Sequence, residues 1–271
     1  MIEGEPSRTA WAAALHRAAH QVVDSGRVFP DPVAVPITGW SSSRVAQDAL
    51  EHPRRRGMRA FIACRHRYAR DVLAGCDPQA QVVVLGAGLD TTAYQPGSLL
   101  LGPVCEVDHP ATQRWKRDRL EEAGISATVP TVYVPVDFEA DDLTRALVAA
   151  GFDRARPAAV VWLGVIVYLT RPAIEQTIAT IARLTTARTD LVLDYGEPAT
   201  LSSDRRAQAV AALGEPWLSR LAPHEMAELL DAHGLRVVED LGLAGWGSRY
   251  LGLPPEFANR PSGHMLHAAL S

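Results

Sequence analysis

Several features that mark other protein classes are scarce or absent in this chain of 271 residues. Its three cysteines, Cys64, Cys76 and Cys105, form no Cys-x-x-Cys pair, which argues against a disulfide scaffold and against a zinc site. No apolar run reaches membrane-spanning length, and the first residues lack the basic and apolar regions of a signal peptide. We therefore expect a cytoplasmic protein without membrane contact and without a bound metal.

Long runs of charged residues of one sign are also absent. The net charge is −4, and the one basic cluster of note, Arg54–Arg56 with Arg59, has no accompanying aromatic series of the kind that stacks on bases. The sequence therefore gives no support for a nucleic-acid partner. A hydrophobic content of 47% is enough for one large domain, or for a core with a cap.

From Gln81 onward, short apolar runs alternate with segments of helical spacing, which predicts a mainly parallel sheet. We expect strands at 81–85, 101–108, 129–136, 158–167 and 190–194, and two closing strands at 234–241 and 264–269. Helices are expected at 7–24, from 41–43 onward, and at 53–76, 110–123, 143–150, 172–184, 204–213 and 223–232. The proline-rich stretch before Gly39 and the segment Trp246–Tyr250 are expected to be irregular.

The chain is organised around a β-branched run that ends at Leu85 and meets Gly86-Ala87-Gly88. This pattern predicts a buried strand, a tight turn and a helix whose N-terminal N–H groups and dipole favour a ligand, as where an open α/β sheet begins a nucleotide site. The third glycine of the dinucleotide fingerprint is absent, because Thr91 stands in its place. An NAD-dependent dehydrogenase is therefore the least favoured of the cofactor enzymes.

Asp108 ends the next expected strand, 20 residues after Gly88. A carboxylate at that distance accepts hydrogen bonds from ribose hydroxyls of an adenosine ligand. The alternative is a helix N-cap before Pro110. The glycine turn upstream favours ribose binding.

Other candidates sit where the later strands end. Asp137 could accept from an adenine amino group while Phe138 packs on the ring, but the pair by itself favours a helix N-cap beside a core aromatic. Tyr168 could line a substrate pocket or complete the core. The dispersed histidines His224, His233, His264 and His267 show no metal-ligand spacing and are expected to be ordinary surface or core residues.

Three arginines lie close together on the expected helix before the glycine turn: Arg65, Arg67 and Arg70. One of them could bind a carboxylate in bidentate fashion. Spacing alone favours the commoner case, in which all three extend from an amphipathic helix into solvent.

Taken together, four segments resemble one family. They are Val83-Val84-Leu85-Gly86-Ala87-Gly88-Leu89-Asp90-Thr91, Glu106-Val107-Asp108-His109-Pro110, Pro135-Val136-Asp137-Phe138 and Trp162-Leu163-Gly164-Val165-Ile166-Val167-Tyr168-Leu169-Thr170. In this order and spacing they resemble the leucine carboxyl methyltransferase-like family of S-adenosylmethionine enzymes, and within it the polyketide O-methyltransferase-like branch. Further likeness lies in Ser7-Arg8-Thr9-Ala10, Arg65-His66-Arg67-Tyr68 and Arg249-Tyr250.

The resemblance implies a class I methyltransferase fold. This is a Rossmann-like, mostly parallel seven-stranded sheet with helices on both faces and a helical N-terminal cap. The implied division is a cap at 1–78, a cofactor-binding core at 79–200, and cap helices and strands at 201–271 that complete the same sheet. The N-terminal helices and the segment around 201–222 would close over the site.

The resemblance also implies residue roles. Gly86, Ala87 and Gly88 would border the methionine and ribose portions of S-adenosylmethionine, with Asp108 on the ribose hydroxyls. Asp137 and Phe138 would hold the adenine, and Arg65, unlike Arg67 and Arg70, would pair with the cofactor carboxylate. Tyr168 would lie near the methyl donor and the substrate entrance.

One departure from the family concerns Leu163, which stands where many members carry a glutamate before the glycine. Its presence removes one polar contact near the cofactor.

The expected reaction is methyl transfer to a carboxylate or hydroxyl of a small, natural-product-like molecule. No clear general base is present, which favours a carboxylate or an acidic hydroxyl as acceptor. Alternatives are methylation of a protein C-terminal carboxylate, or a methyltransferase fold that catalyses another reaction or only binds a ligand.

Overall fold

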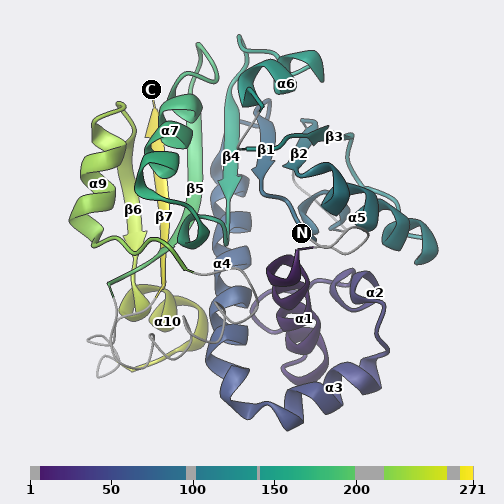
Figure 1. The fold of residues 1–271 in the computed structure, drawn as a ribbon. Coiled ribbons are helices and arrows are strands. Elements are labelled where there is room, and N and C mark those ends of the chain that lie inside the picture. The colour runs from purple at the N-terminus through teal and green to yellow at the C-terminus, as the bar shows by residue number, and fades with distance from the viewer. Residues whose placement is uncertain (1–6, 96–101, 139–140, 199–216, 255–262, 271) are drawn as a thin grey trace.

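A single seven-stranded sheet forms the centre of the molecule (Figure 1). The computed structural model describes residues 7–95, 102–138, 141–198, 217–254 and 263–270. The strands are β1 (Gln81–Leu85), β2 (Val104–Asp108), β3 (Thr131–Pro135), β4 (Ala158–Trp162), β5 (Thr189–Gly196), β6 (Arg236–Leu241) and β7 (Gly263–Leu270). Their order is β3-β2-β1-β4-β5-β7-β6, with only β7 antiparallel to its neighbours. The expected mostly parallel α/β fold is confirmed.

The parallel strands are apolar on both sides because both faces of the sheet are covered. In β1, Val83 and Leu85 enter one apolar cluster, while Val82 and Val84 enter another on the opposite face. All five residues of β1 are buried. This explains why the strand is a continuous apolar run and lacks alternation.

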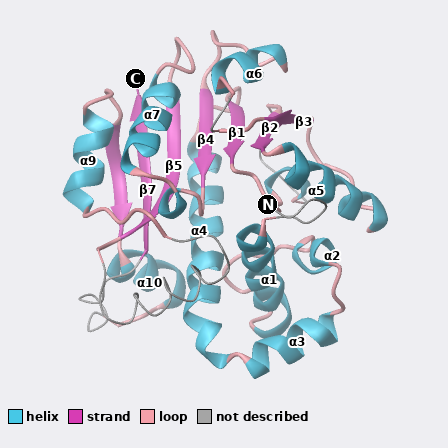
Figure 2. Cartoon of the chain, viewed as in Figure 1, coloured by secondary structure: helices cyan, strands magenta, loops and turns pink. Residues whose placement is uncertain are grey.

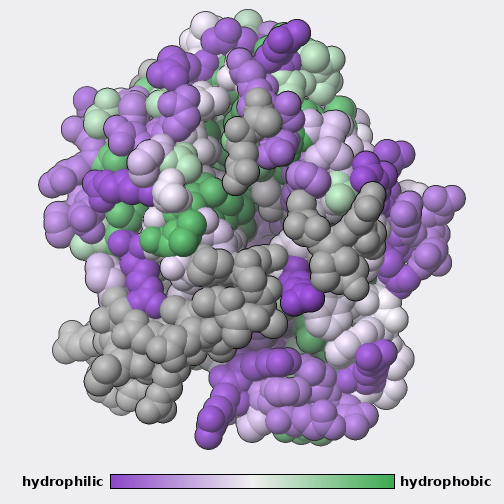
Figure 3. Space-filling model, viewed as in Figure 1, coloured by the Kyte–Doolittle hydropathy of each residue, from purple (hydrophilic) through white to green (hydrophobic). Residues whose placement is uncertain are grey.

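Helices cover both faces of the sheet (Figure 2). On the Val83 face the apolar cluster includes side chains of α6 (Leu143–Ala149), α7 (Arg171–Ala182) and α9 (Pro223–Asp231). On the Val82 face it includes side chains of α4 (Arg56–Gly75), α5 (Pro110–Glu122) and α10 (Leu243–Leu251). In the view of Figure 3, much of the coloured surface is hydrophilic, and an apolar area lies left of the centre.

A smaller helical layer forms from the N-terminal part of the chain. It contains α1 (Arg8–Val23), α2 (Ala34–Thr38) and α3 (Ser42–Glu51), and a one-turn 3-10 helix, η1 (Pro53–Arg55), leads into α4. Ser7 and Ser41 cap α1 and α3 by accepting backbone N–H bonds. Figure 1 shows this layer beside the ends of the strands towards which the β4 arrow points, the edge where such sheets bind ligands.

Four expectations about local structure are wrong. The stretch before Gly39 contains the short helix α2, and Trp246–Tyr250 lies in α10. Tertiary packing explains α10, because Trp246 is buried against Phe61 and its indole donates to the Gly263 carbonyl oxygen at 3.0 Å.

The other two differences concern the strand ends. The apolar run 158–167 divides where Gly164 adopts a φ of 71°, so β4 ends at Trp162 and a 3-10 turn, η3 (Ile166–Tyr168), follows. After the glycine turn, the described chain forms only η2 (Thr92–Tyr94), a three-residue 3-10 turn. A helix dipole therefore does not assist the glycine turn.

The helix expected at 204–213 lies outside the described residues. Among the helices in the described ranges, none combines the length and apolar composition that a membrane span requires.

Candidate functional site

The turn after β1 requires glycine at two positions. Gly86 and Gly88 have φ values of 62° and 48°, in the left-handed region. A Cβ atom on Gly86 would lie 2.5 Å from Val165 Cγ2, and one on Gly88 would lie 3.0 Å from the Cβ of Ala10. Since Ala10 is in the first turn of α1, the N-terminal layer closes directly on this turn.

Asp108 lies at the opening of the same turn. Its carboxylate accepts from the backbone N–H of Gly88 at 2.5 Å and from that of His109 at 2.6 Å. Ala87 N donates to the Val107 carbonyl oxygen at 3.0 Å, which joins the turn to β2. The N-cap of α5 is His109, so the capping alternative for Asp108 is wrong. Burial raises the pKa of the Asp108 carboxyl, while the bonds from Gly88 and His109 oppose this rise.

Arg65 projects from α4 to the ends of β4 and β5 and is buried. Its Nη1 donates to Asp194 Oδ2 at 3.2 Å, and Asp194 Oδ1 accepts from the Gly164 backbone N–H at 2.5 Å. Arg65 Nε is buried and has no hydrogen-bond acceptor among the described residues. Because a buried N–H normally has an acceptor, this atom indicates a place for a ligand oxygen. Arg67 and Arg70 are partly exposed, as expected for arginines at a helix surface.

The end of β3 contributes Asp137 and Phe138. Asp137 is partly buried, and its backbone N–H donates to Asp141 Oδ2 at 2.8 Å. The Phe138 side chain is 42% exposed, so its ring is available to a planar ligand. The Val136 N–H donates to the Asp108 carbonyl oxygen at 3.0 Å, which places these residues beside the end of β2.

Leu163 and Tyr168 follow β4. Leu163 is partly buried against the apolar cluster on the α4 face. Tyr168 is partly exposed in η3. The N–H of Leu218 donates to the Val167 carbonyl oxygen at 2.7 Å, so the segment before α9 lies against η3.

A buried aspartate that the sequence analysis missed joins the N-terminal layer to the glycine turn. Asp31 Oδ2 accepts from Arg17 Nε at 3.2 Å and from Thr91 Oγ1 at 2.7 Å. Arg17 also donates to the Leu89 carbonyl oxygen. Thr91, which replaces the third glycine of the dinucleotide fingerprint, thus has a specific partner. Between two prolines Asp31 resembled an ordinary turn residue, and no local signal distinguished it.

These residues fit a ligand with separate carboxylate, ribose and base groups. The buried Arg65 Nε suits the carboxylate, Asp108 at the glycine turn suits vicinal hydroxyls, and the exposed Phe138 ring suits a base. Within the described ranges, no group of three or more His, Cys, Asp or Glu side chains could hold a metal ion.

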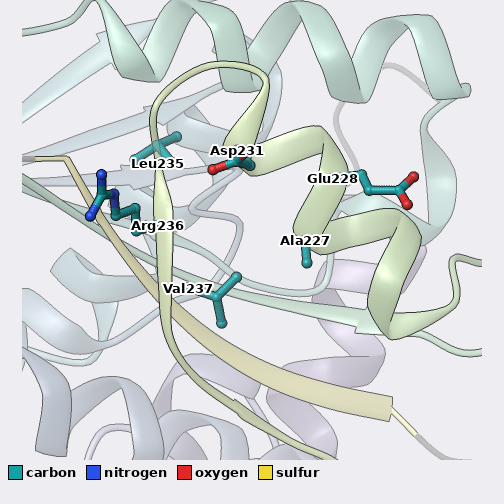
Figure 4. A pocket seen from close by; sticks show the side chains of 6 residues that line it. All are labelled: Ala227, Glu228, Asp231, Leu235, Arg236 and Val237. Carbon is teal, nitrogen blue, oxygen red and sulfur yellow. The ribbon is translucent and has the colours of Figure 1, made fainter.

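A shallow cavity of about 360 Å³ lies elsewhere, between α9 and the edge strand β6 (Figure 4). Its lining residues are Ala227, Glu228, Asp231, Leu235, Arg236 and Val237. Three strands separate β6 from β1 in the sheet, and the charged ends of Glu228 and Arg236 point away from each other. This cavity is therefore distinct from the site at the glycine turn.

Comparisons with known proteins identify the family and the fold class. The family model of the leucine carboxyl methyltransferases matches residues 10–182. Two curated relatives carry the name "Putative S-adenosyl-L-methionine-dependent methyltransferase". One, from Streptomyces coelicolor, is 30% identical over 83% of this chain and 82% of its own length. The other, from Streptomyces avermitilis, is 28% identical over 93% of each chain. The crystal structure of a DUF574 family protein from S. avermitilis matches over 100% of both chains, with a TM-score of 0.61 and 17% identity.

The fold and these relatives together define a class I methyltransferase that uses S-adenosylmethionine. The chain belongs to the leucine carboxyl methyltransferase family. The expectations for family, fold class, enzyme class and cofactor are thereby confirmed.

Proposed function

We propose that the enzyme transfers the methyl group to an oxygen, of a carboxylate or a hydroxyl, on a small natural-product-like acceptor. The observation that carries this proposal is the closure of α1 on the glycine turn, where a Gly88 Cβ would lie 3.0 Å from Ala10. The segment before α9 also lies against η3. A covered sheet edge of this kind suits a small acceptor better than the surface of a protein.

The proposed cofactor-binding residues are Arg65, Gly86, Ala87, Gly88, Asp108, Asp137, Phe138 and Leu163, and Tyr168 is the proposed acceptor-pocket residue. Arg65 would bind the carboxylate through its buried Nε, while Asp194 and Gly164 hold its guanidinium. Asp108 would accept from the ribose hydroxyls. Leu163 supplies an apolar contact where many family members supply a carboxylate. We propose that the chain comprises a helical cap at 1–78, a cofactor-binding core at 79–200 and a segment at 201–271 that completes the same sheet.

S-adenosylmethionine supplies an electrophilic methyl group on a positively charged sulfur. The work left to the chain is to align the acceptor with that group and to exclude water. Arg65 would fix the carboxylate end of the cofactor and Asp108 its ribose, and the N-terminal layer shields the sheet edge. An ionised carboxylate acceptor needs no more than this, whereas a hydroxyl acceptor also needs a group to take its proton.

Calorimetric titration with S-adenosylmethionine, S-adenosylhomocysteine and NAD tests the cofactor site. We expect binding of the first two and none of NAD. Transfer of a tritiated methyl group to small hydroxyl and carboxylate compounds then tests the acceptor class. Methyl esters release labelled methanol in base, and methyl ethers do not. Peptides with a free C-terminal carboxylate form the comparison set, and label transferred only to peptides would contradict a small-molecule acceptor.

A further inference from the structure

The glycine turn after β1 is held from outside the sheet by the N-terminal layer. Asp31, between α1 and α2, accepts at its Oδ2 atom from Thr91 Oγ1 at 2.7 Å and from Arg17 Nε at 3.2 Å. Its Oδ1 accepts from the Val33 backbone N–H at 3.1 Å, directly before α2. Arg17, on α1, also donates to the Leu89 carbonyl oxygen. Two positions of the turn segment, Leu89 and Thr91, are therefore bonded to side chains of the N-terminal layer.

These contacts are enclosed by protein. The side chains of Arg17 and Asp31 are 3% and 0% exposed, and Thr91 is buried. Hydrogen bonds and ion pairs inside a protein are stronger than in water, and a buried group that loses its partner is costly. The link between the layer and the turn therefore resists small displacements more than a surface contact does.

The turn depends on this support because the described chain does not continue from it into an α-helix. Only the three-residue η2 follows. On the sheet side, the Gly88 N–H donates to the Asp108 carboxylate at 2.5 Å. The segment from Gly88 to Thr91 is thus fixed at one end by β2 and at the other by the N-terminal layer. Since Gly88 orients Asp108, a shift of the turn would move the group that is proposed to bind the ribose.

We propose that Asp31 is a positioning residue that keeps the glycine turn in the geometry that binds S-adenosylmethionine, and that the cofactor in turn tightens the docking of α1 and α2. Because Asp31 is completely buried, it acts through Thr91 and Arg17 and does not touch the cofactor. The reverse effect is required, since a coupling between two equilibria acts equally in both directions. This inference rests on the proposed cofactor site at Gly86–Gly88 and Asp108.

A second carboxylate of the same layer separates positioning from simple stabilisation. Asp24 follows α1 and accepts from Arg59 Nε at 2.7 Å and Nη2 at 3.3 Å, which ties α1 to α4. Its other side-chain contact is with His20 Nδ1 at 3.1 Å. Asp24 therefore stabilises the N-terminal layer through partners that lie on α1 and α4 and not on the glycine turn.

The first test is Thr91→Val, because valine has nearly the shape of threonine and lacks the hydroxyl that bonds to Asp31. Thr91→Ser keeps that hydroxyl. Calorimetric titration with S-adenosylhomocysteine measures the Kd of each variant. We expect the Kd to rise about 10-fold in Thr91→Val, through loss of a buried hydrogen bond to a carboxylate, and to stay within about twofold of wild type in Thr91→Ser.

Two controls isolate the bond to Asp31. Gln95 Nε2 donates to the same Thr91 hydroxyl at 3.1 Å, so Gln95→Met removes this second bond alone and should leave the Kd within about twofold of wild type. Asp24→Asn should lower the Tm of the protein and should also leave the Kd within about twofold. Either control would show a 10-fold loss of affinity only if the Asp31 contact were not the cause.

Hydrogen exchange, measured by mass spectrometry, tests the reverse effect. Saturating S-adenosylhomocysteine should slow the exchange of amides in α1 and α2 of the wild type. This slowing should be smaller in Thr91→Val at ligand concentrations that saturate both proteins. A purely structural role for the Asp31 contact would speed exchange equally with and without ligand, and the slowing caused by the ligand would stay the same.

Three results would overturn the inference: an unchanged Kd in Thr91→Val, an equal loss of affinity in Gln95→Met or Asp24→Asn, or an unchanged effect of the ligand on exchange in α1 and α2. A wild type that fails to bind S-adenosylhomocysteine would instead contradict the proposed function, and wild-type affinity in Asp108→Asn would contradict the proposed cofactor site.

Discussion

The guanidinium of Arg65 and the backbone of Gly164 are in such close contact that a Cβ atom on Gly164 would lie 2.9 Å from both Nη atoms of Arg65. Gly164 also donates its N–H to Asp194, the carboxylate that pairs with Arg65. The break after β4 and the last residues of β5 therefore position one arginine from α4. Its buried Nε is left for a ligand oxygen.

Gly164→Ala should weaken cofactor binding by displacing Arg65. Gly164 has a φ of 71°, so alanine also introduces backbone strain of about 1 kcal/mol. Gly124→Ala is the matched control, because Gly124 has a φ of 64° and no atom within 4 Å of its added Cβ. In calorimetric titrations we expect the Kd for S-adenosylmethionine to rise at least 10-fold in Gly164→Ala only. Equal affinities in the two variants would show that the Arg65 contact is unimportant.

Asp108→Asn should weaken cofactor binding, and its affinity for the cofactor should no longer decline as the pH is lowered. Because burial raises the pKa of the Asp108 carboxyl, its ionised fraction begins to fall at a pH above the usual range for aspartate. A protonated carboxyl accepts ribose hydroxyls poorly, so wild-type affinity should decline as the pH is lowered towards 5. Binding isotherms between pH 5 and 8 measure this slope. A slope that persists in Asp108→Asn would assign it to another group.

Phe138→Ala should reduce cofactor affinity with little effect on folding. The ring is 42% exposed, so its removal costs little buried apolar area, whereas stacking on a base contributes about 1–3 kcal/mol. We expect a roughly 10-fold increase in Kd and a free energy of unfolding within about 0.5 kcal/mol of wild type. Val148→Ala, at a position 46% exposed on α6, tests whether loss of any exposed apolar side chain has the same effect. A similar loss of affinity in both variants would rule out stacking by Phe138.

More of the fold than of the site could be predicted from the sequence. Valine-rich runs and helical spacing are local properties, and they were sufficient for β1 to β5 and for α1, α4, α5, α6 and α7. The errors arose where long-range contacts decide the local structure. Trp246 belongs to a helix because its indole is anchored on Gly263, and the run after Trp162 ends because Gly164 turns the backbone.

The residues of the site likewise fall into those that local spacing identifies and those that depend on distant contacts. The glycine turn and Asp108 are recognisable from spacing, but Arg65 resembles its exposed neighbours Arg67 and Arg70 until its partner is known. That partner, Asp194, lies 129 residues away in the chain. Asp31 likewise acquires its contacts from distant elements, so no local pattern distinguishes this residue.

Asp190 should stabilise the fold at neutral pH, and this stabilisation should be lost in acid. The residue lies on β5, and its carboxylate accepts from Arg188 at 2.8 and 2.9 Å and contacts His267 Nε2 at 2.9 Å. Although burial acts to raise it, these partners lower the pKa of Asp190 to about 2. A depressed carboxyl pKa stabilises the fold above the unfolded value of about 3.9, and this stabilisation is lost as the pH falls towards 2.

Asp190→Asn should therefore lower the free energy of unfolding by about 1–2 kcal/mol at pH 7, a figure reduced for the solvent exposure of Arg188. Urea unfolding at pH 7, 5, 4 and 3 measures the difference from wild type, which should shrink steadily below pH 4. Asp118→Asn, at an exposed position on α5, should differ from wild type by less than about 0.5 kcal/mol throughout. A difference that stays constant from pH 7 to pH 3 would mean that Asp190 stabilises the sheet through packing, because the loss of an ionised partner must depend on pH.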